Sequence, residues 1–461
     1  MNSTGFKGSR FERSRFEQMT TVPVEKLVAS LAVPAIVIMM VSALYNMADT
    51  YFVGALGTSA TAAVGVSFSL MAVIQAVGFF FGHGAGNYIS RALGSRNTAD
   101  AEIMAATGFF TAFCIGAAIA AAGSLFLEPL ARLLGATETI LPFARDYLRF
   151  ILLGCPFMVS SLMLNNLLRF QGSAFTGMIG MISGAVLNIA LDPLFIFGLG
   201  LGITGAALAT MISQTASCLL LFALSGRGRE AIRVRPRNFK PSLARYADIA
   251  RGGTPSLLRQ GLMSLSAIFL NRAAGAHGDA VIAAISIVTR VVMMINAMVL
   301  GLGQGFQPVC GFNYGARCYD RVKKAFWFCV RLTTAVLCLM SLGSFIFARD
   351  IIAVFRRDDP EVIRIGALAL RFQSCVIPLG GWIILCNMML QTMGRALPAS
   401  LLAFSRQGLF LLPLLFILVP LWGVLGIQLC SPIADLLTFI LALPMGIHTL
   451  RSVLSVEEGK E

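Results

Sequence analysis

The chain has 461 residues, of which 57% are hydrophobic and 13% are charged, and its formal net charge is +14. A water-soluble fold of this length would need far more charge on its surface, so the composition excludes a soluble domain. Apolar runs recur along the whole chain, and many approach the roughly 20 residues that a helix needs to cross a bilayer. We therefore predict an all-α polytopic membrane protein.

The apolar runs predict twelve transmembrane helices, six in each half of the chain. We place them near residues 25–50, 59–82, 102–124, 139–164, 172–192, 203–224, 250–271, 280–304, 324–347, 363–386, 396–418 and 424–448. The predicted parts are an N-terminal tail (1–24), an N-lobe (25–225), a basic linker (226–247), a C-lobe (248–450) and a C-terminal tail (451–461).

Basic residues gather in alternate loops, at Lys7–Arg15, at Arg91 and Arg96, at 227–240 and at 316–324. Cytoplasmic loops of membrane proteins carry an excess of Lys and Arg, so we expect these loops and both termini to be cytoplasmic. This rule explains the charge without a nucleic-acid partner. The N-terminal segment lacks an A-x-A cleavage signature, so we interpret it as a tail and not as a signal peptide.

Two groups of residues predict no metal or disulfide chemistry. The ten cysteines contain no C-x-x-C pair and lie mostly within apolar runs, so we interpret them as small buried hydrophobic residues. The remaining charged turn mixes both signs and is expected to be solvated, with Arg349, Asp350, Arg356, Arg357, Asp358, Asp359 and Glu361.

An internal repeat at a spacing of about 221 residues organises the chain. The matches keep their order from one end to the other, which chance does not produce. They pair Pro34 with Pro255, GALG (54–57) with GAHG (275–278), Gly82, Gly84, Gly94 and Arg96 with Gly303, Gly305, Gly315 and Arg317, Asn165 and Gly172 with Asn387 and Gly394, and Gly202 and Gly205 with Gly423 and Gly426.

The repeat predicts two similar six-helix lobes. An even number of spans gives both lobes the same orientation, so we expect parallel repeats about an axis along the membrane normal. Two such lobes with a cleft between them form the architecture of an alternating-access transporter. Pro34 and Pro255 predict a kink in the first helix of each lobe, which is either a hinge or a static feature.

Asp49 is the first charged residue after Lys26 and lies inside the first span. A carboxylate there costs at least about 2.5–3.5 kcal/mol on insertion scales, so it is a functional candidate by default. Tyr45 lies one helical turn earlier on the same face. The alternative is a structural, hydrogen-bonded acid near the end of the span.

Asn188 and Asp192 form a second candidate group, because their i,i+4 spacing places both on one face of the fifth span. Thr210 on the sixth span is a candidate to add a hydroxyl oxygen. A carboxylate with amide and hydroxyl oxygens suits a small hard cation. The alternative for Asp192 is a capped helix end, because Pro193 follows it.

The repeat supplies an internal control for these acids. Asp49 corresponds to Leu270 at an offset of 221, and Asp192 corresponds to Leu412 at an offset of 220. Residues that both halves share are expected to form the scaffold. The acids that only the first half carries are therefore the functional candidates.

Arginines inside predicted spans distinguish the second half. Arg259, Arg290 and Arg406 lie there, and Asp435 is the only obvious acid nearby. The simpler interpretation is that they snorkel and that one pairs with Asp435. The sharper hypothesis is that they hold an anionic group of a substrate or lipid.

Three further features of the sequence have ordinary structural readings. The glycine-rich GHGAGN (82–87) is not a phosphate loop, since no G-x-x-x-x-G-K-[ST] occurs in the sequence. We expect His83 at a loop or helix end. Met71, Phe157 and Met163 are candidates to line an adaptable pocket for apolar substrates.

Several segments together resemble the multidrug and toxic-compound extrusion (MATE) family, in its prokaryotic exporter branch. They are LYNMADTYFVGALG, GHGAGNYISRALGSRN, LRFQGSAFTGM, VLNIALDPLFIFGLGLGITGAALAT and GLGQGFQPVCGFNYGA, and the resemblance covers about Pro34 to Gly446. It implies a twelve-helix antiporter in the prokaryotic plasma membrane that exports organic, often cationic, compounds in exchange for H⁺ or Na⁺.

The resemblance also implies roles for particular residues. The family's cation and proton site falls on Tyr45, Asp49, Asn165, Asn188, Asp192 and Thr210, with Na⁺ possible at Asp49, Asn188, Asp192 and Thr210. We expect the substrate cavity to involve Tyr45, Met71, Phe157, Met163, Arg259, Arg290 and Arg406.

The expected partners are small organic substrates and membrane lipids, with no ATP, no cofactor and no second subunit required. The resemblance leaves a flippase for a lipid-linked precursor as the alternative function. No HExxH or G-x-S-x-G motif occurs, so an intramembrane enzyme is not expected.

Overall fold

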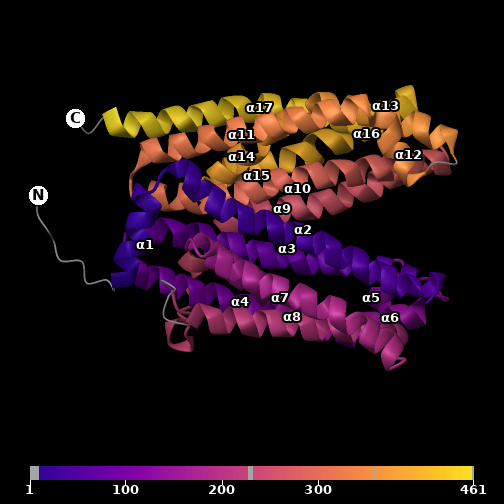
Figure 1. Ribbon diagram of the computed structural model, residues 1–461, viewed down its shortest axis with the longest axis horizontal. Coiled ribbons are helices and arrows are strands. Elements are labelled where there is room, and N and C mark those ends of the chain that lie inside the picture. Colours follow the sequence, from indigo (N-terminus) through magenta and orange to yellow (C-terminus); the bar gives the residue numbers. More distant parts are fainter. Residues whose placement is uncertain (1–9, 227–231, 357–358, 459–461) are drawn as a thin grey trace, which may run out of the picture. The chain divides into compact units, whose positions relative to one another are not determined.

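The computed structural model describes residues 10–226, 232–356 and 359–458. Parts of three predicted charged segments therefore lie outside the described residues: the start of the basic N-terminal cluster, residues 227–231 of the linker, and Arg357 and Asp358 of the mixed-charge turn. Residues 459–461 of the predicted C-terminal tail also lie outside them. The described chain is almost entirely helical and contains no strand (Figure 1), which confirms the all-α prediction.

The chain divides into two compact units. Unit 1 contains Met1–Gly253 and Gly311–Cys318, and unit 2 contains Thr254–Cys310 and Tyr319–Glu461. Two long helices, α9 (Leu243–Gly275) and α10 (Asp279–Gly315), contribute to both units.

The helices of unit 1 follow the predicted spans. They are α1 (Arg10–Thr21), α2 (Val24–Gly54), α3 (Thr58–Gly94), α4 (Thr98–Leu125), α5 (Leu127–Leu133), α6 (Leu141–Phe170), α7 (Ala174–Pro193), the π-helical η1 (Leu194–Gly198), α8 (Gly202–Gly226) and the short η2 (Pro236–Asn238). The central helix is α6, which packs against α3, α4, α7 and α8 and is buried along most of its length.

Unit 2 repeats this order. Beyond its parts of α9 and α10 it has α11 (Tyr319–Ile346), α12 (Ala348–Phe355), α13 (Pro360–Val376), η3 (Ile377–Leu379), α14 (Gly380–Thr392), α15 (Ala396–Phe404), the π-helical η4 (Ser405–Leu411), α16 (Leu412–Trp422) and α17 (Val424–Glu458). Here α17 packs against α13, α14 and α16.

Eleven of the described helical segments are long and apolar enough to cross a membrane. The twelfth long helix, α9, has 33 residues but is more polar, with Ser256, Arg259 and Gln260 near its middle. The structure thus reproduces the predicted set of twelve long helical segments. The first, second and tenth are several residues longer than predicted.

The second span ends later than the prediction. We expected residues 59–82, with His83 at a loop or helix end, but α3 continues to Gly94 and His83 is buried. The expectation for His83 was wrong because the glycines of GHGAGN serve helix packing. A Cβ at Gly82 would meet the side chain of Asn166, and one at Gly84 would meet the carbonyl oxygen of Ile249.

The ends of unit 1 also extend beyond the predicted N-lobe. Part of the predicted N-terminal tail forms α1, where Met19 is buried and its carbonyl oxygen accepts a hydrogen bond of 3.2 Å from Asn313. The start of α9 packs on α3, with Gly253 against Phe80. These contacts place the division of the chain at Gly253, beyond the predicted linker.

The backbone confirms the internal repeat. Unusual positive φ angles recur in pairs at the repeat offset: 112° and 109° at Gly57 and Gly278, 88° and 80° at Gly172 and Gly394, and 57° and 54° at Gly202 and Gly423. Arg96 and Arg317, the two described non-glycine residues with positive φ, also form a pair, at 62° and 60°. Both halves therefore turn their chain in the same way at the same places.

Two repeat-related glycines make a reciprocal contact in unit 1. A Cβ at Gly94 would lie 2.1 Å from the carbonyl oxygen of Phe312, and a Cβ at Gly315 would lie 2.1 Å from the carbonyl oxygen of Arg91. Phe312 and Arg91 are themselves related by the repeat. The ends of α3 and α10 can approach this closely only because both positions lack a side chain.

Replacing Gly315 with Ala should therefore destabilise the protein by about 1–3 kcal/mol, because a backbone oxygen cannot move aside as a side chain can. Thermal unfolding of the detergent-purified protein measures the change. Gly343→Ala is the matched control, since nothing lies within 4 Å of a Cβ there. Equal melting temperatures for the two variants would contradict the close contact.

Candidate functional site

The first helix of unit 1 turns Asp49 into the protein. The side chains of Leu44, Met47 and Tyr51 on α2 are exposed, whereas Asp49 is only 3% exposed. α2 packs against α7 and also contacts α8. The carboxylate is therefore directed toward the helices that carry the second candidate group.

That group is assembled as the spacing predicts. Asn188 donates hydrogen bonds of 3.3 Å to Oδ1 of Asp192 and to Oγ1 of Thr210. All three side chains are buried. The first two come from α7 and the third from α8, so one amide joins two helices. Asp192 and Asp49 are close enough for their charges to interact.

Three buried oxygens in this group have no hydrogen-bond partner among the described residues. They are Oδ1 of Asp49, Oδ1 of Asn188 and Oδ2 of Asp192. Buried polar atoms without partners are costly and are uncommon in folded proteins. Their presence together indicates that these atoms serve a ligand that accepts oxygen donors.

A small cavity of about 40 Å³ adjoins the group. This volume suffices for a water molecule or a small ion. Tyr45, the predicted neighbour of Asp49, contributes to its wall, together with Ser42, Met181, Gly184, Ala185, Asn188, Thr210, Ser213, Gln214 and Ser217.

Tyr147 on α6 belongs to the same site, although no sequence pattern pointed to it. Its side chain is fully buried, and it interacts electrostatically with Asp49, Tyr45 and Asp192. The residue lies between Asp146 and Leu148 near the start of α6, where the neighbouring charges suggest a loop edge. Only the packing of α6 at the centre of unit 1 brings it to the acids.

The residue types fit a proton or a hard cation. Carboxylate, amide and hydroxyl oxygens suit ions such as Na⁺, and a pair of nearby carboxylates readily shares a proton. Within the described ranges, no group of three or more His, Cys, Asp or Glu residues is arranged to hold a metal ion. The oxygens of Asp49, Asn188, Asp192 and Thr210 would hold Na⁺ if it binds.

The equivalent positions in unit 2 form an apolar cluster. Leu270 and Leu412, the counterparts of Asp49 and Asp192, pack against the same group of buried residues, which includes Leu411, Leu415 and Cys430. The repeat thus brings these two positions together in both units. Unit 1 fills them with acids and unit 2 with leucines.

Asn165 does not join the acids through any contact shown. Its Oδ1 would lie 2.6 Å from a Cβ at Gly177, which is eleven residues and therefore about 16 Å along α7 from Asn188. Its predicted role in the cation site stays a prediction.

The three apolar candidates for a substrate pocket lie in unit 1. Met163 is fully buried, with its Cε against Gly108 of α4, and Met71 is also buried. The ring of Phe157 contacts Phe113 at a centroid distance of 5.7 Å. This packing favours a core role for the two methionines.

The three arginines of unit 2 have different surroundings. Arg406 forms an ion pair with Asp435, which also accepts a hydrogen bond of 2.7 Å from Gln373. Arg290 is exposed on α10. Arg259 is half-buried and contacts Asn387. The expected pair with Asp435 therefore involves Arg406.

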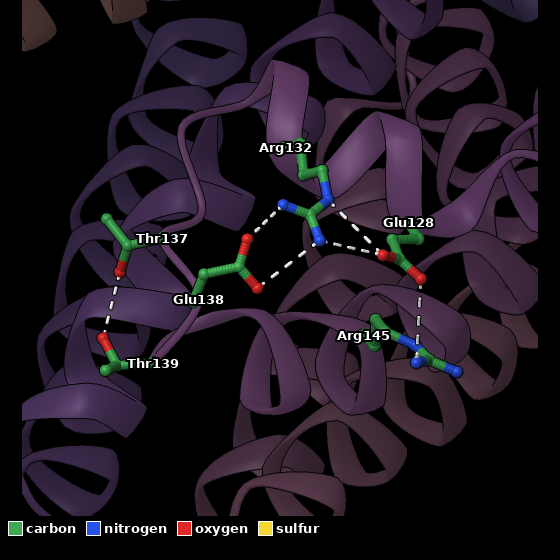
Figure 2. A network of polar contacts seen from close by, with 6 residues as sticks. All are labelled: Glu128, Arg132, Thr137, Glu138, Thr139 and Arg145. Atoms are coloured by element: carbon green, nitrogen blue, oxygen red, sulfur yellow. Dashed lines mark hydrogen bonds and ion pairs between the residues drawn. The ribbon is translucent and has the colours of Figure 1, made fainter.

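A separate ionic network joins α5 to α6, as Figure 2 shows. Arg132 bonds to Glu128 and Glu138, and Arg145 lies 4.0 Å from Glu128. Hydrogen bonding to Arg132 lowers the pKa of the Glu138 carboxyl. All four side chains are largely exposed, so each pair contributes little to stability. This network is a solvated surface feature and not a candidate site.

The sequence matches the MatE family model over residues 34–194 and 255–417, which together are more than half of the chain and correspond to its two repeats. The chain belongs to the MatE family. The multidrug export protein MepA of Staphylococcus haemolyticus is 28% identical to it over 438 residues, covering 94% of this chain and 95% of MepA.

Solved structures of the family have the same fold. A crystal structure of a MATE protein in the bent conformation has a TM-score of 0.90 and 26% identity, covering 98% of this chain and 99% of the other. A transporter of the MOP superfamily from Pyrococcus furiosus, described with a reverse polarity of its binding pocket that suggests a different function, has a TM-score of 0.88 and 26% identity, covering 97% of this chain and 99% of the other.

The apolar counterparts in unit 2 lead to a prediction for the acids. The double substitution Asp49→Leu and Asp192→Leu should leave the melting temperature of the purified protein unchanged or raise it, because replacing buried polar groups together by apolar ones is often neutral or stabilising by about 1–4 kcal/mol. The single Asp49→Leu substitution should melt lower than the double one. Failure of the double variant to fold would show that the acids are structural.

Proposed function

We propose that this chain exports small organic, often cationic, compounds across the membrane in exchange for H⁺ or Na⁺. The observation that carries this proposal is the buried group of oxygens at Asp49, Asn188 and Asp192. An antiporter must bind and release its coupling ion in every cycle. A carboxylate site inside a helical lobe meets this requirement.

The curated relative supports the choice of substrate class. It is a multidrug export protein, and it aligns with this chain over nearly its full length. The similar fold of the Pyrococcus furiosus transporter shows that the fold alone does not fix the substrate. The acids of this chain's first repeat, absent from its second, are therefore the stronger support for ion-coupled export.

An ion gradient is the proposed source of free energy, because the sequence has no G-x-x-x-x-G-K-[ST] loop for a nucleotide. H⁺ or Na⁺ would enter the site from outside and neutralise one of the two carboxylates. The repulsion between Asp49 and Asp192 would then fall, and Asn188 could change its hydrogen bonds to Asp192 and Thr210.

This local change would favour a form of unit 1 with lower affinity for the exported compound. The ion and the compound would thus bind with negative coupling, which is what exchange requires. Alternating access of the two lobes would move each to its own side. The alternating basic loops orient the protein with both termini in the cytoplasm of a prokaryotic cell.

The flippase alternative receives less support. It would use Arg259, Arg290 and Arg406 as a common central site. Within the described part of unit 2, no contact joins these three residues, and the charge of Arg406 is balanced by Asp435. Nothing in the described geometry favours enzymatic turnover.

The transport of a fluorescent organic cation into liposomes tests the proposal. Uptake should be driven by a proton gradient alone or by a Na⁺ gradient alone, which names the ion. Asp49→Asn should reduce gradient-driven uptake at least about tenfold, because an amide neither binds a proton nor balances the charge of Na⁺. Glu138→Gln, on the exposed network, should transport normally. Undiminished uptake in Asp49→Asn and Asp192→Asn would refute the proposed coupling site.

A further inference from the structure

Arg259 occupies the middle of the most polar long helix. It lies sixteen residues from both Leu243 and Gly275, the ends of α9, and thus about 24 Å from each end along the axis. An arginine side chain is much shorter than this distance. Snorkelling therefore cannot take the guanidinium beyond the end of the helix, so its charge stays at the level of the neighbouring helices.

The polar contact that unit 2 shows for Arg259 is a weak one. Its Nη1 lies 3.5 Å from Oδ1 of Asn387 on α14. A guanidinium has five N–H donors, so one long bond to a neutral amide leaves most of its capacity for other acceptors. The side chain is half-buried and not sealed in the core.

No carboxylate in the described part of unit 2 balances this charge. Asp435, in the middle of α17, is held by Arg406 and Gln373. The other acids lie at or near the ends of helices, namely Asp279, Asp320, Asp350, Asp359 and Glu361. A lone cation at this depth is expensive, and such residues mark functional sites.

The surroundings of Arg259 are rigid and amphiphilic. Asn387 is fixed by a hydrogen bond of 2.7 Å from its Nδ2 to the carbonyl oxygen of Ala399. One turn further along α14, Gln391 donates a bond of 2.8 Å to Ser256 on α9. Met263, one turn beyond Arg259 on the same face, is exposed. A fixed cation thus lies beside an adaptable apolar side chain.

The repeat separates Arg259 from the scaffold, as it separates Asp49. At the offset of 221, Arg259 corresponds to Ile38, an apolar residue. The architecture of the lobe therefore does not require an arginine here. Each half carries its own buried charge, acidic in the first and basic in the second.

We propose that Arg259 and Asn387 form an anion subsite that binds the carboxylate of zwitterionic or anionic amphiphilic substrates. The guanidinium holds the carboxylate through charge-assisted hydrogen bonds, and Asn387 orients the guanidinium. The inference rests on the proposed export function and extends its substrates beyond organic cations.

A matched pair of dyes tests the subsite. The probes are a rhodamine methyl ester, which is cationic, and the corresponding free acid, which adds a carboxylate. Their uptake is measured in phosphatidylcholine liposomes under the driving gradient, for the wild type, Arg259→Gln and Arg259→Lys. Arg331→Gln is the control, because Arg331 is another arginine within a span and is exposed on α11.

Arg259→Gln should lower the ratio of acid to ester uptake about tenfold, the loss expected for a charge-assisted hydrogen bond. Arg259→Lys should restore part of the ratio, and Arg331→Gln should not change it. Persistent ester uptake shows that the Gln variant is folded. An unchanged ratio in Arg259→Gln, or a wild type that carries the ester but not the acid, would overturn the subsite alone.

Two further outcomes distinguish the subsite from a failure of export and from a lipid-binding residue. A wild type that transports neither dye would refute the proposed export function, and the subsite would fall with it. Repeating the assay with added phosphatidylglycerol tests a lipid headgroup as the anion. If Arg259→Gln changes both dyes equally and only in the anionic vesicles, the residue binds lipid and the substrate subsite is wrong.

Discussion

The structure depends on the burial of two neighbouring carboxylates in one of two otherwise similar halves. Asp49 and Asp192 are almost inaccessible to solvent, and one oxygen of each lacks a hydrogen-bond partner among the described residues. A folded protein keeps such an arrangement only if something binds there or if the site changes during function. Because the counterparts Leu270 and Leu412 pack in an apolar cluster, the fold itself does not need the acids.

The duplication makes this comparison possible, and the backbone shows how strictly it is kept. The positive φ angles recur in pairs, and the contact of Gly94 with Phe312 is repeated by that of Gly315 with Arg91. These positions have steric reasons to stay the same in both halves. Side chains that differ between the halves are therefore the ones released from the scaffold, and they include the charges of Asp49 and Arg259.

Much of the fold and the centre of the site could be predicted from the sequence. The long helical segments follow from apolar runs, and Asn188, Asp192 and Thr210 could be grouped by helical spacing because their contacts lie within one helix or between adjacent spans. The role of Tyr147 could not be predicted, since only the tertiary packing of α6 brings it to the acids. His83 was misplaced because glycines that pack helices together resemble glycines that end them.

The central claim is that the coupling ion and the exported compound compete for unit 1 through Asp49 and Asp192. The most direct measurement is to count the H⁺ and Na⁺ ions released when an organic cation binds the purified protein in weakly buffered detergent solution. The account predicts release of H⁺ or Na⁺ by the wild type and none by the double variant Asp49→Asn and Asp192→Asn. Saturating binding without ion release, or the same release from the double variant, would contradict it.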